Sequence, residues 1–479
     1  MGKSVLSRIV VVSNRVAEPK AGKSAGGLTV GVMGALKQQG GIWFGWGGTT
    51  CTGEAKDAEL KRRGKITFAT IELNETDFDA YYNGFSNGSL WPLAHYLLGF
   101  FSYDRSQYEA WRRVNTTFAR KLLPLLEPDD LIWVHDYHLF PLAEELRRAG
   151  VTNPIGFFLH VPFPGIAVLQ ALPPWRQILQ SLCMYDVIGF QTEQDREDFL
   201  ECLRFAGLGG DRRGNDSGRI EAIQRRLTVD VFPIGIDVDE CAQQAQESAR
   251  LASVQRLERA LMGRPLIMGV DRLDYSKGLP DRFRAFDQLL SDYPSSRGQL
   301  VYMQIAPPTR AGVRAYQDIR EELEQLTGNI NGRFAEPEWV PIRYLNRGFA
   351  RPTLMGFLRL ARIGFVTPLR DGMNLVAKEY VAAQDPADPG VLVLSQLAGA
   401  ARELTSAVMV NPYDGRGVAE GLQTAASMAR EERVERHTDM LAVLRKNDIN
   451  VWRQRFVEAL ENSRQATGAG ARESAYGDR

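Results

Sequence analysis

Short apolar runs alternate with amphipathic stretches along most of the chain. Runs of four to eight apolar residues that end in polar or turn residues are typical of buried strands, whereas apolar residues every three or four positions predict helices. The first half contains predicted strands at Arg8–Val16, Ile42–Trp46, Lys65–Leu73, Leu131–His135, Ile155–His160 and Val187–Gln191. The second half contains predicted strands at Pro265–Val270, Gln299–Ile305, Pro341–Leu345, Ile363–Pro368, Val391–Ser395 and Ala407–Asn411. Helical patterns lie between them at Thr192–Phe205, Pro280–Leu290, Arg310–Leu326 and Asn374–Gln384. This alternation indicates an α/β protein built from βαβ units with parallel sheets.

The pattern divides the chain near residue 240. An apolar run, Leu227–Asp237, is followed by a polar helical stretch, Glu240–Met262, and a new strand begins at Pro265. We therefore expect two doubly wound domains, one over residues 1–240 and one over 241–450. Folds of this kind bind ligands outside the carboxyl ends of their parallel strands.

The C-terminal segment carries a single apolar face. Trp452, Phe456 and Leu460 are four residues apart, so they line one side of a helix predicted over 451–466. Such a face needs a partner. The residues that follow, 467–479, are rich in Gly, Ala, Ser and charge, which predicts a disordered tail.

The charge balance excludes a general attraction to polyanions. The 479 residues include 44% hydrophobic and 24% charged residues, an ordinary globular composition, and 58 Lys and Arg balance 58 Asp and Glu. No net field therefore draws the chain to nucleic acid or to an anionic membrane. Recognition of a phosphate group must come from individually placed residues, and we expect small-molecule partners only.

The four cysteines, Cys51, Cys183, Cys202 and Cys241, are scattered and form no C-x-x-C pair. This predicts neither a disulfide framework nor a zinc site, and it favours a reducing compartment. The N-terminus lacks the apolar core of a signal peptide, and no apolar run approaches the ~20 residues of a membrane span. We therefore expect a cytoplasmic protein.

The first strand is followed by a glycine-containing loop. Gly-Lys-Ser at 22–24 matches the end of a P-loop, but Ala17 occupies the position of its first glycine, which disfavours that interpretation. Gly26 and Gly27 precede a helical pattern, and glycines there let an anionic ligand approach a helix N-terminus. A plain turn explains them equally well. Arg15, at the end of the strand, has the geometry to hold a phosphate by two hydrogen bonds or to form a surface ion pair.

Two successive strands of the first domain end in titratable residues. One ends with His135, Asp136 and His138 in close succession, and the next ends with His160. A metal site would use the first three, but no further His or Cys cluster completes it. A carboxylate of Asp136 that accepts hydrogen bonds from sugar hydroxyls is the favoured interpretation. A single histidine at a strand end is often structural, whereas two neighbouring polar strand ends favour a site.

The second domain contains two loops that join a strand to a helix. In Val-Asp-Arg-Leu-Asp-Tyr-Ser-Lys-Gly, residues 270–278, Arg272 and Lys277 supply two cations suited to a pyrophosphate. In the second loop Asp371 and Gly372 form a turn before a helix, whose N-terminal N–H groups favour phosphate.

Glu379 follows Gly372 by about two helical turns, a rise of roughly 10 Å. That separation resembles the span from a sugar across a pyrophosphate to a ribose. If the sugar lies near Gly372, the Glu379 carboxylate is therefore at a distance suited to the ribose hydroxyls. Lys378 and Glu379 as surface charges on a solvated helix remain the alternative.

These segments together resemble the trehalose-6-phosphate synthases, which are retaining glycosyltransferases of family 20. The stretches that carry the resemblance are VVSNR, SAGGL, WFGW, YYNGFSN, VHDYH, FFLHVPFP, RLDYSKG, QIAPPTR and LRDGMNLVAKEYVAAQ, and they extend from about residue 8 to 464. The resemblance implies the GT-B fold: two Rossmann-like doubly wound domains face a central cleft, and a C-terminal helix crosses back to the N-terminal domain.

The resemblance also implies the residues of the site. For the acceptor, glucose 6-phosphate, they are Arg15, Tyr82, Trp91, Asp136 and Arg310. For the donor, UDP-glucose, they are Gly26, Gly27, His160, Arg272, Lys277, Phe349, Asp371, Gly372, Met373, Asn374, Leu375, Val376, Ala377, Lys378 and Glu379. Those with an implied catalytic role are Asp136, His160, Arg272, Lys277 and Asp371.

The implied reaction forms trehalose 6-phosphate and UDP without a cofactor or a metal ion. Arg272, Lys277 and the helix N-terminus stabilise the departing charge instead. The family favours a front-face route, in which the departing phosphate oxygen helps to take the proton of the acceptor. A pseudo-glycosyltransferase that couples cyclitols and a catalytically silent sugar-phosphate sensor are the alternatives. The nucleobase of the donor and a homo-oligomeric state, dimer or tetramer, stay open.

Overall fold

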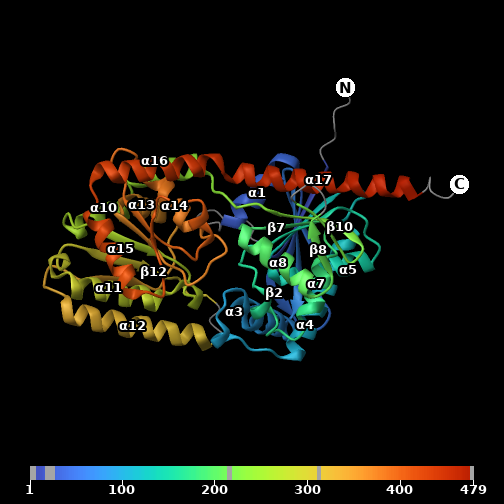
Figure 1. Cartoon of the computed structure of the whole chain (residues 1–479), viewed down its shortest axis with the longest axis horizontal. Coiled ribbons are helices and arrows are strands. Elements are labelled where there is room, and N and C mark those ends of the chain that lie inside the picture. The colour runs from blue at the N-terminus through green and yellow to red at the C-terminus, as the bar shows by residue number, and fades with distance from the viewer. Residues whose placement is uncertain (1–6, 17–26, 213–217, 310–313, 475–479) are drawn as a thin grey trace, which may run out of the picture. The chain divides into compact units, whose positions relative to one another are not determined.

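The computed structural model describes residues 7–16, 27–212, 218–309 and 314–474. They form two compact units (Figure 1). The first comprises residues 7–16, 27–233 and 450–474, and the second comprises residues 234–449, in both cases within the described ranges. The first unit ends at Pro233, upstream of the predicted boundary at residue 240. Asp237 caps helix α9 (Val238–Ser248), which packs against helices of the second unit.

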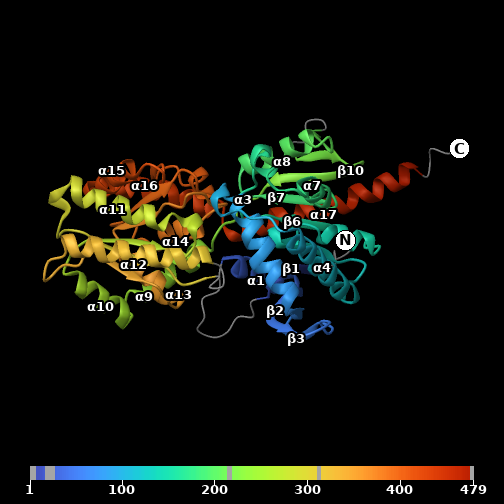
Figure 2. The same cartoon turned by 90° about the horizontal axis from the view of Figure 1, so that it is seen from below.

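A ten-stranded sheet forms the centre of the first unit, in the order β3-β4-β2-β1-β5-β6-β7-β10-β9-β8. The strands are β1 (Ile9–Arg15), β2 (Gly41–Cys51), β3 (Glu59–Arg63), β4 (Ile66–Asn74), β5 (Leu131–His135), β6 (Ile155–Phe158), β7 (Val187–Phe190), β8 (Gly209–Arg212), β9 (Arg219–Ala222) and β10 (Arg225–Val231). Strands β4, β2, β1, β5, β6, β7 and β10 are parallel to one another, and all of them except β10 were predicted as strands. Antiparallel β3 extends one edge of the sheet (Figure 2), and antiparallel β9 and β8 extend the other.

The second unit contains a six-stranded parallel sheet in the order β13-β12-β11-β14-β15-β16. Its strands are β11 (Leu266–Val270), β12 (Val301–Ile305), β13 (Ile342–Leu345), β14 (Ile363–Val366), β15 (Val391–Ser395) and β16 (Val408–Val410). This is the strand order of a Rossmann fold. In both units the order reverses beside the first strand: between β1 and β5, and between β11 and β14.

Helices cover both faces of the six-stranded sheet (Figure 1). One layer contains α11 (Leu279–Asp292), α12 (Arg314–Phe334) and α15 (Gly415–Ser427). The other contains α9, α10 (Ala252–Leu261), α13 (Arg351–Leu360), α14 (Leu375–Ala383) and α16 (Arg430–Lys446). The single helical stretch expected over Glu240–Met262 is two helices, because the chain turns at residues 249–251.

Helix α17 (Ile449–Ser474) packs on the sheet of the first unit. Its apolar face is buried there, as predicted: the Phe456 ring stacks on Trp133 with a centroid separation of 4.7 Å. Gly156 makes room for this contact, because a Cβ atom at that position would lie 2.7 Å from Phe456. The helix continues to Ser474, so the predicted end at 466 and the disordered tail from 467 are wrong as far as residue 474.

Helix formation there follows from the good helix formers Ala, Arg and Glu, which outweigh two glycines. Residues 475–479 lie outside the described residues. Within the part of the chain that the structure describes, no helix combines the length and the apolar character needed to cross a membrane.

Candidate functional site

The motifs predicted to carry chemistry lie where the strand order of each sheet reverses. In the first unit Arg15 ends β1 and Asp136 follows β5 directly, and these two strands are neighbours. In the second unit the 270–278 loop follows β11 and Asp371 lies beyond β14, again a neighbouring pair. Because the carboxyl ends of such strands splay apart, each unit has an open position for a ligand at this point.

Asp136 is held in a backbone conformation that few residues other than glycine adopt. Its φ is 77° and its ψ is 161°. Two hydrogen bonds hold Asp136 in this strained conformation. The N–H of Asp136 donates to the carbonyl of Phe158 at 2.9 Å, and its Oδ1 accepts from the N–H of His160 at 3.4 Å. Backbone strain of this kind costs about 1–3 kcal/mol and concentrates at functional sites.

His135 and His160, at the ends of adjacent strands, form a direct pair. Their Nδ1 and Nε2 atoms are 3.1 Å apart, so one ring donates and the other accepts. Burial lowers the pKa of His160 to about 3. The pKa of His135 lies well below its usual value, mainly because the ring is buried and to a smaller extent because His160 is close. Both rings are therefore neutral near pH 7. His135 is fully buried, and its Nε2 has no partner, whereas His160 is partly exposed.

Aromatic residues surround the loop that follows Asp136. Tyr82 lies on a π-helix, Asp79–Leu90, and stacks on His138 with 5.8 Å between ring centroids. Asn87 joins the two segments, because its amide donates to the carbonyl of Tyr82 at 2.7 Å and its oxygen accepts from the Tyr137 hydroxyl at 3.0 Å. Trp91 is buried and its ring packs against that of Tyr137, so it supports the loop that follows Asp136.

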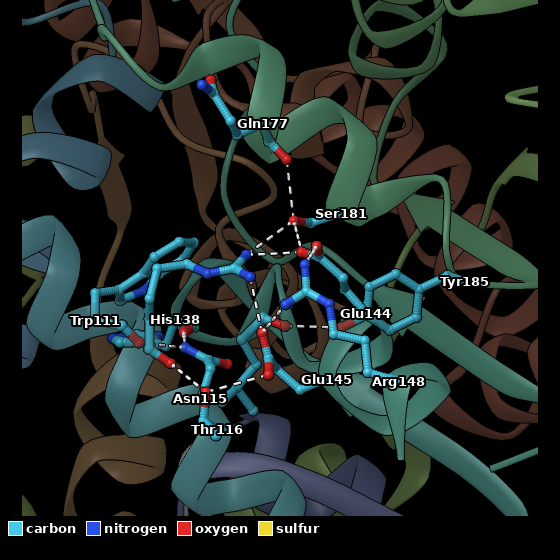
Figure 3. Close-up of polar contacts among 12 residues, drawn as sticks. Trp111, Asn115, Thr116, His138, Glu144, Glu145, Arg148, Gln177, Ser181 and Tyr185 are labelled. Atoms are coloured by element: carbon cyan, nitrogen blue, oxygen red, sulfur yellow. Dashed lines mark hydrogen bonds and ion pairs between the residues drawn. The ribbon is translucent and has the colours of Figure 1, made fainter. Parts of the chain in front are cut away.

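A polar network fixes the same loop from behind (Figure 3). The Asn115 amide donates to the carbonyl of His138 at 3.1 Å, and the Tyr185 hydroxyl donates to the carbonyl of Leu139 at 2.7 Å. Arg112 lies on the same helix as Asn115, and it donates to Glu144 and Glu145, on the helix after the loop, at 2.7 and 2.8 Å. These hydrogen bonds hold the loop that follows Asp136 in place.

Of four predicted residues in the N-terminal glycine loop and the acceptor set, the structure describes two. Arg15 is exposed, and its guanidinium lies 5.3 Å from the ring centre of Trp46. Gly27 begins helix α1 (Gly27–Gln39). Gly26 and Arg310 lie outside the described residues.

In the second unit, the two strand-to-helix loops meet through an ion pair. Lys277 Nζ lies 2.6 Å from Asp371 Oδ2, and both side chains are largely buried. The Asn374 amide donates to the same oxygen at 3.0 Å, while its own oxygen caps α14 by accepting from the N–H of Ala377. Asn374 has a φ of 86°, a second strained residue at a candidate site.

Asn374 caps the N–H of Ala377, so the N–H groups of Leu375 and Val376, which have no partner within a helix, are the ones suited to an anion. Leu375 and Val376 are partly exposed, whereas Gly372, Met373 and Ala377 are buried. Arg272 of the neighbouring loop has 47% of its side chain exposed, and its Nη2 lies 4.0 Å from Asp274 Oδ2. Asp274 caps the turn that carries Lys277 through the N–H of Ser276.

A buried arginine that sequence reasoning missed lies beneath both loops. Arg282 is 1% exposed, and its guanidinium reaches Asp271, Gln304 and Thr367 at 2.5, 3.0 and 3.1 Å. It also donates to the carbonyl of Lys277 at 3.3 Å. Burial lowers the pKa of Arg282, but the Asp271 carboxylate more than offsets this, and the net shift is upward. The ends of β11, β12 and β14 are therefore joined by one charged side chain.

The two charged residues of α14 lie in different surroundings. Lys378 is fully buried; it donates to the carbonyl of Ile234 at 2.8 Å and pairs with Glu403. Its ammonium group thus stabilises the interior of the unit, and only its backbone remains available for the predicted donor contact. Glu379 instead pairs with Arg351 at 2.6 Å, with about a sixth of its side chain exposed. The alternative of two solvated surface charges is wrong for Lys378.

Phe349, the last of the predicted donor residues, lies just before α13. Its ring packs edge-on against Phe357, and the guanidinium of Arg347 lies 4.9 Å from its centre. No group of three or more His, Cys, Asp or Glu side chains among the described residues has an arrangement that could hold a metal ion.

Comparison with known proteins places the chain in a family. The profile of glycosyltransferase family 20 matches residues 5–462. A trehalose-6-phosphate synthase of Enterobacter sp. (strain 638) is 51% identical over 461 residues, which cover 96% of both chains.

Two solved structures extend this similarity to the fold. A UDP-forming α,α-trehalose-phosphate synthase from Burkholderia xenovorans, in complex with glucose-6-phosphate, is 50% identical with a TM-score of 0.91 and covers 95% of this chain and 100% of that one. An E. coli structure bound with UDP-2-fluoro glucose is 50% identical with a TM-score of 0.90 and covers 95% and 99%. These matches confirm the predicted two-sheet GT-B fold and the predicted class of enzyme: the chain belongs to glycosyltransferase family 20.

Proposed function

We propose that this glycosyltransferase moves glucose from UDP-glucose to glucose 6-phosphate and forms trehalose 6-phosphate and UDP. The observation that carries the proposal is the pairing of Lys277 with Asp371 beside the capped N-terminus of α14. A cation, an acid and free N–H groups at one point of a Rossmann sheet suit a sugar diphosphate. The relatives support the two substrates, because one is bound to glucose-6-phosphate and another to UDP-2-fluoro glucose.

The acceptor is assigned to the first unit. A hexose offers hydroxyl groups and an apolar ring face, which suit a carboxylate and an aromatic wall respectively. Asp136 supplies the carboxylate on a loop that Asn115 holds in place, and Tyr82 supplies the ring on the π-helix that Asn87 joins to this loop. Arg15, exposed at the end of β1, is the candidate for the phosphate of the acceptor. Arg310 remains a candidate for the same group from the sequence alone.

The donor diphosphate is assigned to Arg272, Lys277 and the first turn of α14. When the bond between glucose C1 and the diphosphate oxygen breaks, negative charge grows on that oxygen, and fixed cations and N–H dipoles stabilise it. A new bond forms from C1 to the acceptor hydroxyl oxygen. The proton of that hydroxyl passes to the departing phosphate oxygen, on the same face of the sugar, so configuration at C1 is retained. Neutral His160 is suited to hold a donor hydroxyl by a hydrogen bond rather than to supply a charge.

A turnover assay with purified protein tests the proposal. UDP-glucose and glucose 6-phosphate together should give equimolar UDP and trehalose 6-phosphate, whose α,α linkage is read by NMR. Free glucose in place of glucose 6-phosphate is the control for the acceptor phosphate. Coupling of cyclitols but not of glucose 6-phosphate would favour the pseudo-glycosyltransferase, and binding without turnover would favour the silent sensor.

We also propose a cytoplasmic location and a homo-oligomeric state. All four cysteines are free, and burial raises the pKa of Cys183, Cys202 and Cys241 to about 12. Thiols in that state suit a reducing compartment. Fractionation of the native host and light scattering of the purified chain test these two statements separately.

A further inference from the structure

We propose that Arg351 is a positioning residue, which holds the Glu379 carboxylate in the orientation that accepts the two hydroxyl groups of the nucleotide ribose. The inference rests on the donor assignment above, and it adds a specificity-determining residue to that site. Arg351 is not part of any motif that the sequence singled out.

The contact between the two side chains is short and sheltered. Arg351 Nη1 donates to Glu379 Oε1 at 2.6 Å, and the two side chains are 19% and 16% exposed. Charge-assisted hydrogen bonds of this length are roughly twice as strong as neutral ones. Because α14 carries Glu379 and α13 begins at Arg351, the bond fixes the rotation of the carboxylate relative to its own helix.

The other arm of Arg351 meets a neutral partner. Its Nη2 donates to the sulfur of Cys241 at 3.3 Å, on helix α9. Burial raises the pKa of that thiol to about 12, so it carries no charge at neutral pH. Burial lowers the pKa of Arg351, but Glu379 more than compensates, and the guanidinium stays charged. Among the described residues, Glu379 is the carboxylate to which Arg351 donates a hydrogen bond, whereas Glu240 acts on it only through its charge. The guanidinium thus bonds to both α9 and α14.

This arrangement leaves half of the carboxylate for a ligand. Oε1 is engaged by Arg351, whereas Oε2 accepts no hydrogen bond from the described residues. An ionised carboxylate has about four lone-pair sites, and one arginine N–H uses only one of them. Two vicinal hydroxyl groups require two acceptor directions at a fixed angle, which a freely rotating Glu379 would offer only part of the time. Arg351 removes that freedom before the nucleotide binds.

A purely structural role for Arg351 would be to attach α13 to α14, and the chain provides a matched control for that role. Arg359, eight residues later on α13, donates to Asp385 and to the carbonyl of Ala383 at 3.0 and 3.2 Å, at the C-terminal end of α14. Its side chain is 20% exposed, close to the value for Arg351. Loss of either arginine weakens the contact between the same two helices, but only Arg351 touches Glu379.

The test compares two ligands, UDP and 2′,3′-dideoxy-UDP, by calorimetry on the full-length protein. The wild type should prefer UDP by about tenfold or more, because a buried carboxylate that loses its hydroxyl partners costs at least the equivalent of one tenfold step. Arg351→Met should reduce that preference towards one, and Arg351→Lys should keep an intermediate preference. Arg359→Met should keep the wild-type ratio even if it lowers the melting temperature as much. Glu379→Ala is the reference variant, with no preference expected.

If Arg351→Met keeps the wild-type preference for UDP over 2′,3′-dideoxy-UDP while Glu379→Ala loses it, the positioning role is overturned and the donor assignment is left intact. A wild-type ratio in Glu379→Ala instead overturns the ribose contact itself, and the inference with it. If Arg351→Met does not fold, Arg351→Lys decides: a ratio equal to that of the wild type then overturns the proposal.

Discussion

The two units reverse their strand order in the same way but place opposite chemistry at that point. In the first unit, β5 ends at the neutral His135 and is followed by the strained Asp136, the neutral His160 follows β6, and Tyr82 stacks on His138. In the second unit, the ends of β11 and β14 carry Lys277, Arg272 and the Asp371 that pairs with Lys277. A shared topology thus fixes where a ligand binds, whereas the side chains at the strand ends fix which ligand it is.

The difference also extends below the surface. The buried titratable groups of the first site, His135 and His160, stay uncharged because burial disfavours the protonated form of each ring. Below the second site, the buried cations Arg282 and Lys378 each have a carboxylate partner, Asp271 and Glu403. A diphosphate binds best where positive charge lies close by, and the buried ion pairs hold the backbone of the loops that carry this charge. A hexose makes no such demand.

Removal of the buried cation should give the largest effect and confine it to the second unit. Arg282→Met leaves Asp271 buried without a partner, which costs about 3–5 kcal/mol of stability. Because Arg282 also holds the carbonyl of Lys277, UDP affinity should fall as well. Urea unfolding and UDP calorimetry measure the two effects. The control is Arg284→Met on the same helix, whose side chain is 51% exposed and whose loss should change stability by about 0.5 kcal/mol or less. Equal losses in both variants would contradict the network.

Donor and acceptor binding should be separable by one substitution in each unit. Lys277→Ala removes a charge-assisted contact to the diphosphate and should weaken UDP by about 1.5–3 kcal/mol, as measured by calorimetry. Asp136→Asn should reduce kcat/KM for glucose 6-phosphate and leave UDP affinity at the wild-type value. If Asp136→Asn weakened UDP as much as Lys277→Ala does, the division of labour between the two strand reversals would be wrong.

The sequence predicted every strand of the two parallel sheets except β10, because each of the others is a short apolar run with a polar end. It missed β3, β8 and β9, which are short and polar: all five residues of β3, Glu59–Arg63, are exposed. Edge strands pair through the backbone, so their side chains carry little apolar signal. The sequence also gave no sign of the π-helix that carries Tyr82, because its apolar residues fit the spacing of an ordinary helix.

The residues proposed to contact a ligand belong to sequence motifs, whereas the residues that hold them in place do not. Arg272, Lys277 and Asp371 stand in motifs, whereas Arg282 and Arg351 do not. Arg282 did leave a signal: it lies between Leu279 and Phe286 on the apolar face of α11, where a charge needs a buried partner. Arg351 left none, because Glu379 is 28 residues away and only the packing of α13 on α14 joins them.

The histidine pair of the first unit should make stability depend on pH in a known direction. His160 has a pKa of about 3 in the folded state and about 6.5 when unfolded, so the unfolded chain binds more protons between these values. Stability is then complete above pH 6.5 and falls as the pH is lowered. The loss for His160 amounts to about 2 kcal/mol at pH 5, and His135 adds to it.

Melting temperatures at pH 7 and pH 5 test this dependence. The wild type should lose more stability on acidification than the double variant His135→Asn/His160→Asn does. Equal losses would mean that the pair is not held neutral by the fold, and the contrast with the charged site of the second unit would disappear.

The smallest expected effect is that of metal removal, and it tests whether the cations of the second unit are sufficient. Many transferases hold the diphosphate of a nucleotide sugar through a divalent ion, which acidic side chains coordinate. Here Asp371 is paired with Lys277 at 2.6 Å, so an ammonium group occupies the place beside the carboxylate that such an ion would take. Turnover should therefore survive treatment with excess EDTA at an unchanged rate, measured as UDP released, and added Mg²⁺ should not raise it. A strict requirement for Mg²⁺ or Mn²⁺ would show that Arg272, Lys277 and the N-terminus of α14 do not stabilise the departing diphosphate by themselves. In Lys277→Ala, by contrast, Asp371 loses its partner and becomes a potential ligand, so a modest activation by Mg²⁺ that is absent in the wild type would support the same account from the opposite direction.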